Sequence, residues 1–102
     1  MNLDEKKWTE SIKNSENSKI LDVRTPEEFD GGYIKESINL NIYDSHGFLE
    51  GIKDFSKSDC IHIYCRSGAR SFQACELMKQ MGYKSVYNLE GGILDWGGDI
   101  IK

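Results

Sequence analysis

The chain has 102 residues, of which 38% are hydrophobic and 29% charged, and its formal net charge is -4. A chain of this length can bury one modest core, so we expect residues 1–102 to form a single domain. The negative charge and the lack of a basic stripe exclude general binding to nucleic acid or to anionic membranes. Apolar runs of four or five residues cannot span a bilayer, and the N-terminal residues lack the apolar stretch of a secretory signal. We therefore expect a cytoplasmic protein that contacts neither nucleic acid nor membrane.

Strand-like and helix-like segments alternate along the chain. The first helix is indicated by Trp8 and Ile12, which lie four residues apart among polar residues. Apolar and β-branched runs indicate the strands, and apolar residues at helical spacing indicate the later helices. In chain order, the sequence predicts a helix over 4–15, a strand over 19–23, a short helix that starts after Thr25, a strand over 37–42, a helix over 48–55, a strand over 60–64, a helix over 71–81, a strand over 85–89 and a weak helix over 93–102.

Two of these helices carry residues that are typical of helix ends. Thr25 fits the N-cap position, Pro26 fits the first helical position, and Glu28 completes a capping box with Thr25. Gly82 fits a left-handed C-cap after the helix over 71–81. These residues predict one helix start and one helix end independently of hydrophobic periodicity.

The alternation of strands and helices predicts an α/β fold. We expect a three-layer sandwich with a small, central, mainly parallel sheet and helices on both faces. No strand is evident before Trp8, so the sheet is expected to have four or five strands. Ligands of such sheets bind beyond the carboxyl ends of the strands. The segments 22–24, 65–70 and 90–92, which each follow a strand, should therefore converge.

Cys65 stands where a predicted strand changes into a predicted helix. The pKa of a free thiol is about 8.5, and helix N-termini and nearby cations lower it. Both influences are available here, because a helix follows and Arg66 and Arg70 flank the loop. If the chain curls around the sulfur, its amides form a bowl of donors, for which Gly68 supplies backbone freedom and Ser67 a hydroxyl. This pattern indicates a site that holds a negatively charged sulfur.

The remaining cysteines and histidines do not suggest a second site. Cys60 and Cys75 are predicted to pack in the core, and an odd number of cysteines argues against a disulfide framework. His46 and His62 share no metal-ligand spacing with the cysteines, so we expect neither a metal site nor chemistry from them. Trp96 is predicted to pack in the core.

The segment YCRSGARS, preceded by LDVRTPEEF and followed by NLEGGILDW, resembles the rhodanese family of sulfurtransferases. The resemblance runs in order from about Ile20 to Trp96, and it implies one rhodanese-like domain with a central parallel sheet and no metal or organic cofactor. It also implies that Cys65 accepts a sulfane sulfur as a persulfide and passes it to a thiophilic acceptor. One departure is GYIKESINL, where Tyr33 and Lys35 replace a family histidine and proline, so we expect altered packing there and unchanged chemistry.

The resemblance implies that the active-site loop is the run Cys65, Arg66, Ser67, Gly68, Ala69 and Arg70. The two arginines are candidates for binding an anionic donor such as thiosulfate, with Arg70 the stronger candidate because it closes the loop. The expected partners are a small-molecule sulfur donor and a cyanide or thiol acceptor, which can be a thiol of a protein.

Two other functions and one structural question stay open at this point. Phosphatases and arsenate reductases use a similar cysteine loop, but theirs is one residue longer and ends in arginine where this chain has Ser71. A non-catalytic or redox-sensing rhodanese-like module is the other alternative, which the intact cysteine loop disfavours. Asp22 and Arg24 fit a structural ion pair and a direct substrate contact equally well.

Overall fold

The computed structural model describes residues 1 to 102 and contains one five-stranded and one two-stranded sheet. In chain order, the elements are β1 (Asn2–Leu3), α1 (Glu5–Asn14), β2 (Ser18–Asp22), α2 (Pro26–Asp30), β3 (Tyr33–Ile34), β4 (Ser37–Asn39), α3 (Ser45–Ile52), β5 (Cys60–Tyr64), α4 (Ala69–Gln80), β6 (Ser85–Leu89), the 3₁₀ helix η1 (Ile93–Asp95) and β7 (Ile100–Ile101). No helix is both long and apolar enough to cross a membrane.

The larger sheet is entirely parallel and has the strand order β1-β6-β5-β2-β4. This arrangement confirms the predicted α/β fold, and of the two predicted strand numbers, four or five, the sheet has five. The fifth is the edge strand β1, in which Asn2 and Leu3 pair with Asn88 and Leu89 of β6. Two residues are too few to show an alternating pattern, so the sequence could not reveal this strand.

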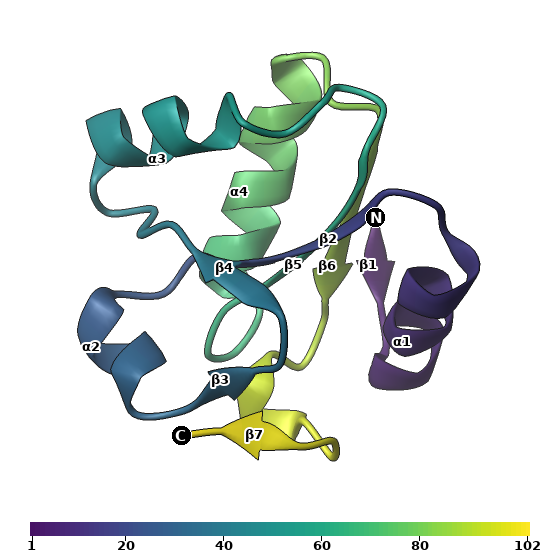
Figure 1. The fold of residues 1–102 in the computed structure, drawn as a ribbon, viewed down its shortest axis with the longest axis vertical. Coiled ribbons are helices and arrows are strands. Elements are labelled where there is room, and N and C mark those ends of the chain that lie inside the picture. Colours follow the sequence, from purple (N-terminus) through teal and green to yellow (C-terminus); the bar gives the residue numbers. More distant parts are fainter.

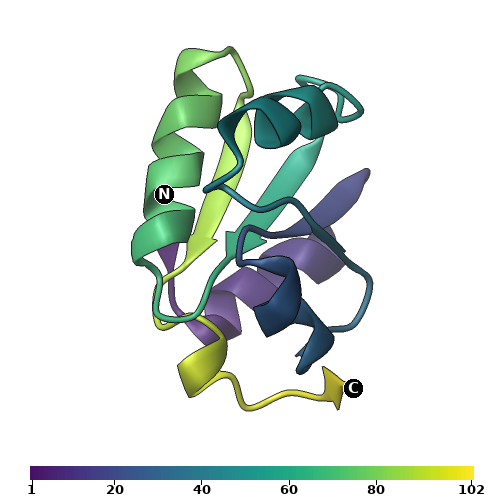
Figure 2. The same ribbon diagram turned by 90° about the vertical axis from the view of Figure 1, so that its left-hand side faces the viewer.

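Helices cover both faces of this sheet (Figure 1; Figure 2). One core lies between the sheet and helices α3 and α4, and a smaller core lies between the sheet and α1. Because successive side chains of a strand point to opposite faces, Ile61 and Ile63 of β5 enter the first core. Tyr64 of the same strand enters the second core, where it contacts Trp8 of α1. The central strand is therefore buried on both sides.

Local sequence features explain where α2 and α4 begin. The capping box predicted at Thr25 is present, since Thr25 Oγ1 accepts from the amide of Glu28 and the Glu28 carboxylate accepts from the amide of Thr25. Helix α4 begins two residues earlier than predicted, at Ala69, after Gly68 in the left-handed conformation with a φ of 104°. A glycine tolerates this conformation without strain, so the turn after β5 is tight.

The prediction of a helix over 93–102 was wrong. Only one 3₁₀ turn forms, and the chain then extends into β7, which pairs antiparallel with β3. Gly97 and Gly98 separate the two segments, and glycine pairs disfavour helix continuation. The β3–β7 ribbon lies beyond the carboxyl ends of the parallel strands (Figure 1). Tyr33, at the predicted departure from the family pattern, starts β3 and stacks on Phe29 at a centroid distance of 4.2 Å.

Candidate active site

Three loops meet at the carboxyl edge of the large sheet, as predicted. The loop that starts at Cys65 leaves β5, the segment that contains Arg24 leaves β2, and the segment around Gly92 leaves β6 (Figure 1). Hydrogen bonds tie the loops together: the amide of Val23 donates to the carbonyl of Tyr64, and the amide of Ile93 donates to the carbonyl of Cys65. Parallel strands therefore place segments distant in sequence around one cysteine.

The Cys65 side chain is only 1% exposed and is surrounded by hydrogen-bond donors. The amide of Gly68 donates to Cys65 Sγ at 3.1 Å, and Ser71 Oγ lies 3.4 Å from the same sulfur. Ser71 stands in the first turn of α4 and is fully buried. Ser71 was not among the site residues predicted from the sequence. Its position six residues after Cys65, at the start of a helix whose side chains lean toward the N-terminus, was the available signal.

Hydrogen bonds from neighbouring segments hold three carbonyls of the loop. The amide of Ile93 donates to the carbonyl of Cys65 at 3.0 Å, and the amide of Leu94 donates to that of Arg66 at 3.1 Å. The side chain of Asn88 donates to the carbonyl of Gly68 at 3.2 Å. In a trans peptide the N–H and C=O groups point in opposite directions. Fixing the carbonyl of Arg66 therefore orients the amide of Ser67, which is one of the donors that lower the pKa of Cys65.

Two glycines allow this close approach of backbone to backbone. Gly68 has a φ of 104°, and a Cβ atom there would collide with the carbonyl oxygen of Glu90. Gly92 has a φ of 63°, and a Cβ atom there would collide with the carbonyl of Arg66. Any larger residue at either position must push the two loops apart.

The net effect of these surroundings is a lowered pKa of the Cys65 thiol. Burial is the largest single influence and raises the pKa, because a thiolate is poorly solvated inside a protein. Donation from the Ser71 hydroxyl and from the amides of Ser71, Gly68 and Ser67 outweighs burial. Hydrogen bonds, more than the flanking arginines that the sequence emphasised, thus stabilise the thiolate.

The two arginines of the loop have different surroundings. Arg70 forms a two-pronged ion pair with Glu28 of α2, with Nη1–Oε1 at 2.7 Å and Nη2–Oε2 at 2.9 Å. This contact lowers the pKa of Glu28 to about 2. The Arg70 guanidinium also lies 5.4 Å from the ring centre of Tyr43. Arg66 is exposed, has no ion-pair partner and lines a hollow of about 410 Å³ between α2 and η1.

Asp22 and Arg24 form a buried ion pair at the end of β2. The Arg24 guanidinium donates to both carboxylate oxygens of Asp22, with Nη2–Oδ2 at 2.6 Å, and to the carbonyl of Gly32 at 2.8 Å. It also lies over the ring of Tyr64. These contacts support the interpretation of Asp22 and Arg24 as a structural ion pair, and they connect β2 to the turn before β3. Direct contact of either side chain with a substrate stays a prediction.

The other predicted residues lie as follows. Ser67 and Ala69 are exposed, and Ser67 lines a second hollow of about 540 Å³ whose wall includes the acidic residues Asp4, Glu5, Glu90 and Asp95. Cys75 of α4 is buried in the core, as predicted, whereas Cys60, for which the same was predicted, is only half-buried. His62 is buried between Ser11 and Ser18, and Trp96 packs edge-on against Trp8 at 5.8 Å. His46 lies exposed at the start of α3.

Comparisons with known proteins agree with this geometry. The sequence profile of the rhodanese-like domain matches residues 5–99. A sulfurtransferase of Allochromatium vinosum is 36% identical over 94 residues, which cover 92% of this chain and 85% of that protein. A rhodanese-related protein of Thermoplasma volcanium has a solved structure that matches with a TM-score of 0.81 and 31% identity, over 98% of this chain and 96% of that one.

The domain also occurs as part of longer proteins. A tRNA uridine(34) hydroxylase of Pelagibacter ubique is 33% identical over 98% of this chain, yet this chain spans only 33% of its length. Three observations agree with one another. The domain profile matches nearly the whole chain, the large sheet is parallel and five-stranded, and the match to the sulfurtransferase of Allochromatium vinosum covers 85% of that protein. The chain belongs to the family of rhodanese-like sulfurtransferases.

Proposed function

We propose that Cys65 carries a sulfane sulfur as a persulfide, which it takes from an anionic donor such as thiosulfate and passes to cyanide or a thiol. The observation that supports this most strongly is the amide of Gly68, which donates to its sulfur, with the Ser71 hydroxyl beside it. Inward-facing amides stabilise negative charge before the reaction as well as after it. A buried thiol that needed no charge would not require them.

The reaction has two steps that share one covalent intermediate. In the first step, the Cys65 thiolate attacks the outer sulfur of thiosulfate, a new S–S bond forms, and sulfite leaves with the electron pair of the broken bond. In the second step, a nucleophile attacks the outer sulfur of the persulfide and the Cys65 thiolate leaves. Neither step changes the number of protons on the protein. The outer sulfur carries the charge of the persulfide, so it benefits from the amides of residues 66–70.

The surroundings of the two arginines favour Arg66 for the first contact with an anionic donor. Its guanidinium is exposed and unpaired, whereas that of Arg70 is held by Glu28. Arg70 instead joins α2 to the start of α4 and so keeps the loop closed on that side. The sequence favoured Arg70 because it closes the loop. Its ion-pair partner on α2 lies 42 positions away, and no local pattern reveals that partner.

Thiosulfate treatment followed by mass spectrometry of the peptides tests this function. We expect a mass increase of about 32 Da, one sulfur, on the peptide that contains Cys65. The addition should disappear after cyanide and should be absent from Cys65→Ser. Cys75→Ser is the matched control and should retain it. Thiocyanate production without a Cys65 adduct, or hydrolysis of an aryl phosphate at a similar rate, would contradict the proposal.

A further inference from the structure

The hydroxyl of Ser71 faces two acceptors but has one proton. Ser71 Oγ lies 3.4 Å from Cys65 Sγ, and it makes a much shorter hydrogen bond to Asn88 Oδ1. A hydroxyl donates one hydrogen bond and accepts through its lone pairs. Only one of the two contacts can therefore be a donation from Ser71 at any moment.

The orientation of the Asn88 amide is fixed by its other partners. Its nitrogen Nδ2 lies 3.2 Å from the carbonyl oxygen of Gly68 and 2.9 Å from Oδ1 of Asn2. The carbonyl of Gly68 can only accept, so the nitrogen must face it and Asn88 Oδ1 must face Ser71. Asn88 is 3% exposed, so no bulk water replaces Ser71 as a donor to this oxygen. In the described geometry Ser71 thus donates to Asn88.

It follows that the lone pairs of Ser71 Oγ face the sulfur while the proton points to Asn88. This arrangement suits a neutral Cys65, whose S–H group can donate to Ser71. A thiolate or a persulfide anion has no proton to donate and needs donors instead. The Ser71 proton must then turn from Asn88 to the sulfur, which leaves Asn88 Oδ1 without a donor.

We propose that Asn88 is a positioning residue that holds the Ser71 proton while Cys65 is a neutral thiol and yields it when the sulfur becomes an anion. Asn88 acts through Ser71 and does not touch the reacting sulfur. Because Asn88 competes for the Ser71 proton, the anionic sulfur is stabilised less than it would be by the same loop without Asn88. A less stabilised thiolate is a stronger nucleophile in the first step, whereas it is a poorer leaving group in the second step. This inference rests on the proposed role of Cys65 as sulfur carrier.

The wild-type protein provides the first test. The side-chain amide of Asn88 is followed by NMR while the pH is raised, and Cys65 alkylation by iodoacetamide is measured over the same range. We expect the Asn88 resonances to shift with the midpoint of Cys65 alkylation. The amide of Asn39, which donates to the carbonyls of Asp22 and Arg24, is the control and should not follow that midpoint. An Asn88 amide that ignores the Cys65 transition would overturn the proposal.

A pair of substitutions separates this role from a merely structural one. Asn88→Leu frees the Ser71 proton and should lower the Cys65 pKa by about one unit, a tenfold higher thiolate fraction at a fixed pH below the midpoint. Ser71→Ala removes the donor and should raise the pKa. In the double variant the effect of Asn88→Leu should vanish, because it acts through Ser71.

The outcomes of this cycle also distinguish the inference from the proposed function. If Asn88→Leu shifts the pKa equally with and without Ser71, Asn88 only supports the loop through Gly68 and the inference is wrong. If Asn88→Leu does not fold, the pH titration of wild-type Asn88 still decides. Alkylation needs no sulfur donor, so absent sulfur transfer in the wild type would refute the proposed function without affecting this measurement.

Discussion

Cys65 and Cys75 are almost equally buried, at 1% and 2% exposure, and belong to the same core. The pKa values of their thiols are nevertheless shifted in opposite directions. The surroundings of Cys65 lower its pKa. Burial raises the pKa of Cys75 to about 11. The thiol pKa is thus lowered just before α4 and raised within α4, at two cysteines ten positions apart.

The difference lies in the free amides at the two positions. Cys75 stands inside α4, where each backbone amide already donates to a carbonyl of the preceding turn. Cys65 precedes α4, where the first amides have no partner within the helix and turn toward the sulfur. Burial sets the cost of a thiolate at both positions, and donors reduce that cost at only one of them.

The largest expected difference concerns sulfur transfer itself. Cys65→Ser should lower the turnover of thiosulfate:cyanide transfer by about a thousandfold or more, as removal of a nucleophile does elsewhere. Cys75→Ser should keep the activity and lose about 1–3 kcal/mol of unfolding free energy, because a hydroxyl is buried without a partner. Steady-state kinetics and urea unfolding measure both. Equal activity of the two variants would remove the basis of the comparison.

The second expected difference concerns reactivity with iodoacetamide across pH. Cys65 should be alkylated near neutral pH, whereas a thiol of pKa about 11 has roughly one part in 10⁴ as thiolate at pH 7. Peptide mass spectrometry assigns each modification to its cysteine. Alkylation of Cys75 in folded protein at a rate near that of Cys65 would contradict the assignment of opposite shifts.

The third prediction concerns a substitution that should open the loop and make the surroundings of Cys65 more like those of Cys75. Gly92→Ala places a Cβ against the carbonyl of Arg66, so the bowl should widen and Cys65 alkylation at pH 7 should slow severalfold. Gly82→Ala is the matched control, because Gly82 also has a positive φ, 99°, but open space around its Cα. Gly82→Ala should lose about 1 kcal/mol of stability from backbone strain, and Gly92→Ala should lose more, because its Cβ also collides with Arg66. If both slow alkylation alike, strain in general and not the contact with Arg66 is responsible.

The smallest expected effect concerns Glu28, which binds Arg70 at the rim of the loop. Its pKa is depressed to about 2, so its contribution to stability is present above about pH 4.5 and is lost as the pH falls toward 2. Glu28→Gln should cost about 0.5–1 kcal/mol at pH 7, since the pair is partly exposed, and progressively less as the pH falls through 2. The released Arg70 should also lower the Michaelis constant for thiosulfate about two- to threefold, if it then meets the donor.

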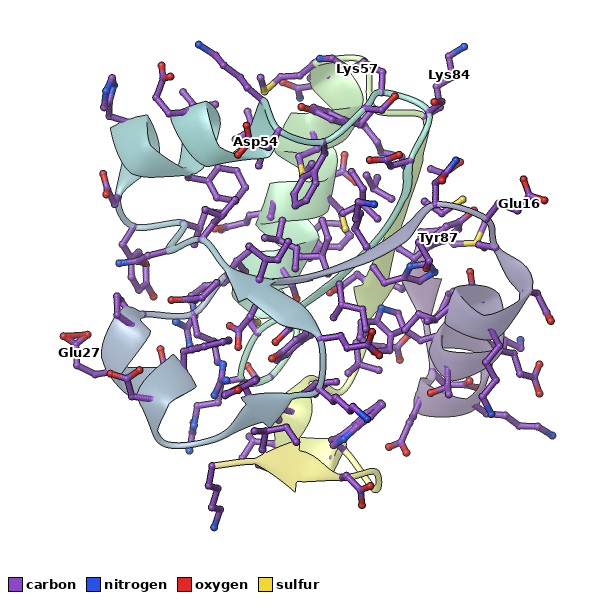
Figure 3. All side chains as sticks on the ribbon, in the orientation of Figure 1. Glu16, Glu27, Asp54, Lys57, Lys84 and Tyr87 are labelled. Atoms are coloured by element: carbon purple, nitrogen blue, oxygen red, sulfur yellow. The ribbon has the colours of Figure 1, made fainter.

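Glu27→Gln is the control for this prediction. Glu27 is the neighbour on α2, but its side chain points away from the body of the molecule (Figure 3). Unfolding by urea at pH 7 and near pH 2, together with the thiosulfate kinetics, should be unchanged for Glu27→Gln. Similar losses in both variants would assign the effect to helix charge and not to Arg70.

Features that depend on neighbouring residues could be predicted from the amino-acid sequence. Four of the five strands of the large sheet follow from apolar runs. The start of α2 follows from Thr25 and Glu28, and the place of Cys65 follows from the change between strand and helix. Hydrophobic periodicity and capping chemistry act over a few residues, so they can be read without a structure. The same reasoning failed at 93–102, where Gly97 and Gly98 lie and the pattern is weak.

The groups that meet around the sulfur are brought together by the folded chain and could not be predicted from the sequence. Glu28 and Arg70, Ser71 and Asn88, and the amide of Ile93 with the carbonyl of Cys65 are far apart in the chain. The short strands β1 and β7 likewise depend on a partner strand for their existence. A pattern in sequence records burial and local conformation but not the partner across the sheet. That partner is set by strand order and register, which place the ends of β2, β5 and β6 at one edge.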